Sequence, residues 1–98
     1  MGIELAVDLA KLTAAELRIQ QALAIYRQAV AKAKAAAAAL LADWEGDAAE
    51  AFRAEQENAY RWHACIIEVV ESFIDELIRT IQKYEDALQK IKDAITNH

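Results

Sequence analysis

The chain has 98 residues, two glycines and no proline, and its formal net charge is −5. Because loops and turns usually need proline and glycine, this composition predicts an all-α fold with long helices and one short connection, in a single domain over residues 1–98. The acidic balance lies in the second half, with eleven acids against six bases after residue 45 and no cluster of lysine or arginine. It argues against binding to nucleic acid or to an anionic membrane surface.

The first helix is predicted over about residues 8–43. Apolar or small residues recur there in alternating steps of four and three, the heptad pattern of helices that pack at a shallow angle. They are Leu5, Leu9, Leu12, Ile19, Leu23, Tyr26, Val30, Ala33, Ala37, Leu40 and Trp44. Asp8 is the expected N-cap, although Thr13 begins a capping-box pattern inside the stripe. The alanine-rich run from Ala29 to Ala42 fits either close backbone approach or plain helix propensity.

A turn is predicted over residues 44–47, with the second helix over about residues 48–95. Gly46 is the one glycine beyond the N-terminus, and glycine ends a helix in the left-handed conformation without a Cβ clash. Asp47 then reads as a cap that places a carboxylate near the start of the next helix. So short a link predicts an antiparallel helical hairpin.

The second helix carries two apolar stripes. The first contains Phe52, Ala59, Ile66, Val70, Phe73, Leu77, Tyr84, Leu88, Ile91 and Ile95, and the second contains Ile67, Ile74, Ile78 and Ile81. A helix with two adjacent apolar stripes has more than one partner to cover, and a two-helix hairpin is too thin to cover both. We therefore expect dimerisation into a four-helix bundle, with a homodimer as the simplest closed solution. The residues predicted to form the hairpin or dimer interface are Phe52, Ile66, Ile67, Val70, Phe73, Ile74, Leu77, Ile78 and Ile81.

No motif in the chain indicates catalysis, and we predict that it is not an enzyme and uses no cofactor. His63 and Cys65 are two residues apart on a helix, hence on opposing faces, and cannot bind one metal ion together. A single cysteine forms no intrachain disulfide, and Cys65 reads as a small core or interface residue. The N-terminus lacks the pattern of a cleaved signal peptide, and no uncharged run approaches the ~20 residues of a membrane span.

The centre of the chain resembles a known family. Trp44-Glu45-Gly46, followed by Asp47-Ala48-Ala49-Glu50-Ala51-Phe52 between two long amphipathic helices, is similar to the WXG family of early-secreted-antigen-like proteins. The resemblance implies a helical-hairpin dimer, homomeric or paired with a related small helical protein, that a type VII secretion system exports. It also implies that Trp44 and Gly46 serve the turn and recognition by the secretion machinery. Packing over the turn is an alternative role for Trp44.

In the family, a tyrosine followed four residues later by an acid near the C-terminus completes the export signal. Tyr84 stands at the expected place, but Leu88 occupies the fourth position after it. Asp86 is about 200° away around the helix and cannot substitute on the same face. Tyr84 is therefore either a degenerate signal or, with Leu88, an ordinary pair in the apolar seam.

Two functional hypotheses follow from the resemblance. The first is a secreted substrate or co-secreted dimer partner that leaves a cytoplasmic pool without a cleaved signal peptide and is recognised by the secretion ATPase. The second is a targeting partner, cytoplasmic if it is not exported, that binds the helical N-terminal region of a larger type VII cargo such as a toxin. An unrelated coiled-coil structural protein is a more distant alternative.

Overall fold

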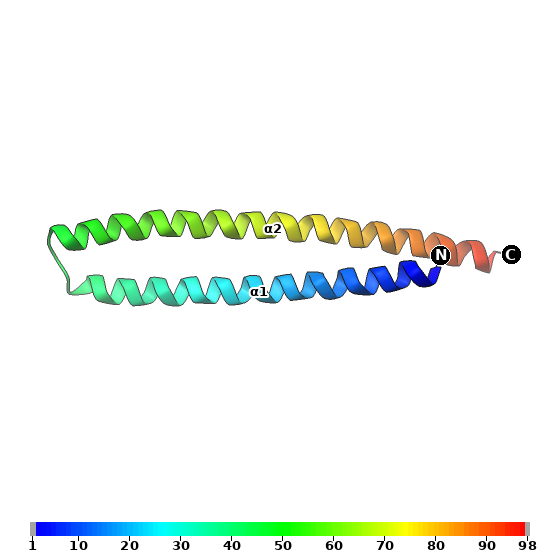
Figure 1. Cartoon of the computed structure of the whole chain (residues 1–98), viewed down its shortest axis with the longest axis horizontal. Coiled ribbons are helices and arrows are strands. Elements are labelled where there is room, and N and C mark those ends of the chain that lie inside the picture. Colours follow the sequence, from blue (N-terminus) through cyan, green and yellow to red (C-terminus); the bar gives the residue numbers. More distant parts are fainter. Residues whose placement is uncertain (1, 98) are drawn as a thin grey trace. The chain divides into compact units, whose positions relative to one another are not determined.

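Two long helices make up nearly all of the chain in the computed structural model, which describes residues 2–97 (Figure 1). Helix α1 spans Gly2–Ala42 and helix α2 spans Asp47–Thr96, with residues 43–46 between them. The two end residues of the predicted domain lie outside the described residues. The fold is the predicted helical hairpin, and no strand occurs within residues 2–97.

The first helix begins at Gly2, six residues earlier than the start predicted near Asp8. The apolar seam explains the difference, because Leu5 is half-buried and extends the seam by one turn beyond Asp8, which is itself exposed. Thr13 does not cap a helix either, since its hydroxyl donates a hydrogen bond of 2.8 Å to the Leu9 carbonyl within α1. Packing of the apolar seam thus outweighs a local capping signal.

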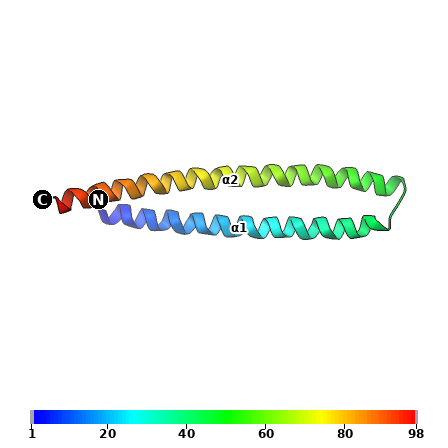
Figure 2. The ribbon, with the colours of Figure 1, turned by 180° about the vertical axis from the view of Figure 1, so that it is seen from behind.

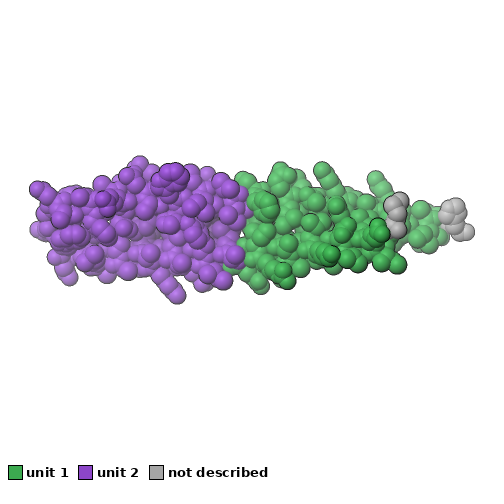
Figure 3. Space-filling model, viewed as in Figure 1, with its two compact units in different colours: residues 1–21, 71–98 green, residues 22–70 purple. Residues whose placement is uncertain are grey.

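The chain divides into two compact units, which Figure 3 shows in different colours. Unit 1 combines residues 1–21 with residues 71–98, and unit 2 is the continuous segment Ala22–Val70 that contains the turn. Within each unit a segment of α1 lies antiparallel to a segment of α2, as both views of the ribbon show (Figure 2). Each unit therefore has its own part of the hairpin seam.

The seam of α2 follows a strict heptad pattern of buried and half-buried residues. In unit 2 these are Arg53, Gln56, Tyr60, His63, Ile67 and Val70, and in unit 1 they are Ile74, Leu77, Ile81, Tyr84, Leu88 and Ile91. Ile74 and Ile81 are among the most buried side chains of the molecule. Ile67, Ile74 and Ile81 of the predicted second stripe belong to this seam and therefore lie inside the hairpin.

Ile66 and Phe73 were predicted on one seam with Val70 and Leu77, as part of the hairpin or the dimer interface, but in the monomer they lie outside the seam that faces α1. Both side chains are exposed, Ile66 at 45% and Phe73 at 57%. The prediction followed apolar residues, whereas the seam near the turn is built from long polar and aromatic side chains whose stems cover apolar surface. Leu40 was likewise predicted on the seam of α1, but it is exposed, and its neighbour Leu41 is half-buried instead.

Candidate interaction site at the turn

The turn brings Trp44 against the first turns of α2. The Trp44 indole and the Phe52 ring pack with their centroids 5.7 Å apart and their planes inclined at 47°. Both side chains are half-buried, and Ala49 nearby in sequence is fully buried. Contacts of this kind between tilted aromatic rings stabilise a fold beyond the area that they bury. The tryptophan therefore packs over the turn while part of its surface stays accessible to a partner.

Gly46 holds a conformation that other residues rarely adopt. Its φ is 108°, the one positive φ within the described residues. A Cβ added at this position would meet no atom within 4 Å, so the requirement for glycine comes from the backbone and not from lack of space. The Gly46 carbonyl accepts a hydrogen bond of 3.1 Å from the Glu50 amide. Gly46 is therefore the N-cap of α2, whose first residue is Asp47, the residue that the sequence predicted as the cap. Gly46 was expected to end α1, but α1 already stops at Ala42.

Arg53 ties the two helices together beside the turn. Its guanidinium donates to the Glu50 carboxylate at 2.5 Å and to the Leu41 carbonyl at 3.5 Å. The carbonyls of the last turn of a helix lack partners within the helix, and a cation is favourable near them. Arg53 thus supports the end of α1 from the first turns of α2.

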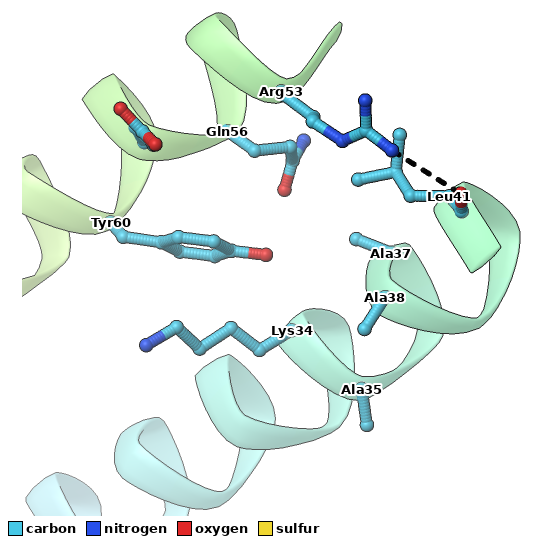
Figure 4. A pocket seen from close by; sticks show the side chains of 9 residues that line it. Lys34, Ala35, Ala37, Ala38, Leu41, Arg53, Gln56 and Tyr60 are labelled. Carbon is cyan, nitrogen blue, oxygen red and sulfur yellow. Dashed lines mark hydrogen bonds between the residues drawn. The ribbon is translucent and has the colours of Figure 1, made fainter. Parts of the chain in front are cut away.

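A hollow of about 440 Å³ opens between the helices next to this contact, inside unit 2 (Figure 4). It is lined by Lys34, Ala35, Ala37, Ala38, Leu41, Arg53, Gln56, Glu57 and Tyr60. The Lys34 ammonium lies 4.8 Å from the centroid of the Tyr60 ring, within the range of a cation–π contact. Small alanine side chains opposite longer ones leave this space open. The lining thus combines small and apolar side chains of α1 with the charged side chains Lys34, Arg53 and Glu57.

Two side chains in the seam of unit 2 form a hydrogen bond across the hairpin. The Tyr26 hydroxyl and His63 Nδ1 form a hydrogen bond, and the two rings meet edge to face with centroids 5.5 Å apart. His63 is half-buried and faces α1, while Cys65 is exposed, so the two side chains do point in different directions. Cys65 therefore does not belong to the core of the hairpin.

Tyr84 and Leu88 are both half-buried on the seam of α2 in unit 1. Tyr84 lines a small hollow together with Glu4, Leu5, Asp8 and Ile91. Packing on the seam is therefore a sufficient structural role for Tyr84 and Leu88. A role of Tyr84 in export stays a prediction.

The predicted interface residues fall into two groups. Phe52, Ile67, Val70, Ile74, Leu77, Ile78 and Ile81 are buried or half-buried in the monomer, whereas Ile66 and Phe73 are exposed. Across residues 2–97 no helix is long and apolar enough to cross a membrane. The same residues contain no group of three His, Cys, Asp or Glu side chains placed to hold a metal ion.

The geometry defines a class of protein: a small antiparallel helical hairpin whose connection carries a Trp-X-Gly turn. Residues 4–87 match the model of the WXG100 family, described as proteins of 100 residues with WXG. The chain belongs to this family, whose members are small helical proteins associated with type VII secretion. The alternative of an unrelated coiled-coil protein is therefore wrong. No curated protein and no solved structure matches the chain.

Proposed function

We propose that this chain is a type VII secretion component that is exported as one half of a helical-bundle dimer and acts by binding other proteins. The observation that carries the proposal is the turn, where the positive φ of Gly46 and the packing of Trp44 on Phe52 give the family's tripeptide a defined structure. A rigid, partly exposed aromatic side chain is the kind of feature that protein partners recognise. The secretion ATPase is the partner that we propose for it.

The amount of exposed surface supports a dimer. The chain exposes 7602 Å², whereas compact monomers of its mass expose about 5600 Å². Within residues 2–97, four hydrophobic residues, Leu23, Ala49, Ile74 and Ile81, are buried, and ten large hydrophobic residues are exposed. Because an interface of standard size buries about 800 Å² on each partner, a dimer would remove much of the excess.

Export dependence tests the proposal in the native host. We expect the protein in the medium of the parent strain and its absence from the medium when the secretion ATPase is deleted. Gly46→Ala should reduce export more than Gly2→Ala, because the Gly2 backbone is helical and a Cβ there would make an ordinary contact of 3.8 Å with Ile91. Equal amounts in the medium with and without the ATPase would contradict the proposal.

A second candidate function is that of a targeting partner for a larger type VII cargo. The observation in its favour is Leu88, which stands where the family's signal has an acid and is half-buried on the hairpin seam. A chain without its own complete signal would travel with, or escort, a partner that carries one. Affinity purification of the tagged chain from the native host separates the two candidates. Recovery with a larger cargo and retention in the cytoplasm would favour the targeting partner.

A further inference from the structure

One face of unit 2 combines small side chains on α1 with large apolar side chains on α2. It consists of Ala22, Ala29, Ala36, Trp62, Ile66 and Val69, all of them exposed, and we call it the alanine–tryptophan face. Trp62 and Val69 are 71% and 69% exposed, although both belong to residue types that usually pack against something. The hairpin itself leaves this surface uncovered.

The three alanines lie on one side of the α1 seam. They follow one another every seventh residue, and at 100° per residue they stand about 100° from the seam residues Leu23 and Val30. Ala35 and Ala38, which line the hollow, stand on the other side of the same seam. The face and the hollow are thus on opposite sides of the hairpin as seen from α1.

On α2, too, the face and the hollow lie on opposite sides of the seam. Trp62, Ile66 and Val69 stand about 80–140° to one side of the seam residues His63 and Ile67. Glu57, which lines the hollow, stands on the other side of that seam. Because the hollow is bounded by both helices, the two sides that do not line it form one common face.

The charges next to this face lie on its outer margin, away from the seam. On α1, Lys32 stands beside the row of alanines, three residues after Ala29 and four before Ala36. On α2, Arg61 lines a small hollow together with Trp62, and Glu55 stands two turns before Trp62. By contrast, the face with the hollow carries Lys34, Arg53 and Glu57. A two-fold dimer places a patch against its own copy, so packing on the face with the hollow would take its charged groups out of water, which is costly, whereas an apolar patch with charges on its margin buries few of them. An apolar centre with a polar margin is also the usual anatomy of a protein interface.

We infer that the alanine–tryptophan face is the surface on which a second copy of this chain packs, with Trp62, Ile66 and Val69 at the centre of the contact. The inference rests on the proposed dimer and adds which face forms it. It differs from the sequence-based expectation, because Trp62, Val69 and the alanines were not among the predicted interface residues. Ile66 is the member common to both sets.

The mass of the protein in solution, measured over a range of micromolar concentrations, tests the inference. The wild-type chain should be a dimer. Trp62→Gln with Val69→Gln should raise the dissociation constant by about 100-fold or more, since each substitution acts twice in a symmetric interface. Both side chains are exposed in the monomer, so the hairpin loses little of its own packing.

A matched pair of variants separates the two faces. Ala29→Gln and Ala38→Gln introduce the same exposed side chain into the same helix, the first on the alanine–tryptophan face and the second beside the hollow. We expect Ala29→Gln to weaken the dimer by about tenfold and Ala38→Gln to leave it unchanged. An equal or larger effect of Ala38→Gln would overturn the inference.

A fluorescence measurement covers the case in which a variant does not fold. The chain has two tryptophans, so Trp44→Phe leaves Trp62 as the sole indole. Its emission should be that of a buried indole at high concentration and should shift to that of a solvated one on dilution, in step with the mass. Emission of a solvated indole in the dimer would overturn the choice of face but leave the proposed dimer standing. A wild-type chain that stays monomeric at these concentrations would overturn both.

Discussion

The indole of Trp44 and the ring of Phe52 meet across the turn with their centroids 5.7 Å apart. This contact joins the last residues before α2 to its first turns. It gives a structural reason for an aromatic residue eight positions after the tryptophan, because the turn places both rings on the same end of unit 2.

Replacing Trp44 by alanine should lower the free energy of unfolding by about 2 kcal/mol, less than for a fully buried tryptophan because the side chain is half-exposed. A double-mutant cycle with Phe52→Ala should give a coupling energy of about 0.5–1.5 kcal/mol. Urea denaturation of the four proteins at one protein concentration measures both quantities. A coupling energy of zero would mean that the two rings do not stabilise each other.

Gly46→Ala should destabilise the hairpin by about 1–2 kcal/mol, because an L residue is strained at a positive φ even where space is available. Thermal unfolding followed by circular dichroism provides the measurement. Gly46→Asn should destabilise the hairpin less than Gly46→Ala, since asparagine tolerates positive φ better than alanine. A variant with alanine at 46 that is as stable as the parent would show that the turn relaxes to another conformation.

Ala49 has no room for a larger side chain, since it is fully buried at the start of α2. We expect Ala49→Leu to cost about 1–3 kcal/mol through overpacking. Ala48→Leu is the matched control, because Ala48 is exposed one residue earlier in the same turn. Denaturant midpoints of the two variants should differ clearly, and equal midpoints would contradict the close packing described for the turn.

The hydrogen bond between Tyr26 and His63 predicts that Tyr26→Phe lowers the free energy of unfolding by about 1 kcal/mol, because the histidine nitrogen loses its partner inside the seam. Tyr60→Phe serves as the comparison, since the recorded contact of Tyr60 is made by its ring to Lys34 and a phenylalanine ring preserves it. That change should stay within about 0.5 kcal/mol. Equal losses for the two variants would argue that the Tyr26 hydroxyl contributes no specific bond.

Periodicity and one glycine were sufficient to predict the hairpin and its turn. In α1 the predicted seam agrees with the structure at nearly every position from Leu5 to Ala37, because apolar side chains alternate there with polar ones at helical spacing. The family assignment likewise followed from Trp44 and Gly46 in the middle of the chain, and the family model confirms it.

The choice between neighbouring stripes on α2 needed the tertiary structure. From residue 59 to residue 74, apolar or aromatic side chains occupy two adjacent positions of the heptad (Ala59 and Tyr60, Ile66 and Ile67, Phe73 and Ile74), and hydrophobicity does not distinguish the one that faces α1. Opposite the alanines of α1, Gln56 and Tyr60 fill the seam with long side chains, and His63 pairs with Tyr26. Ile67 then lies inside the seam and Ile66 outside it. The sequence by itself therefore determined that two helices pair and where the chain reverses, since both depend on local spacing and backbone freedom. Which surface stays uncovered for a partner was decided by side-chain size across the pair, a property of contacts between residues far apart in the chain.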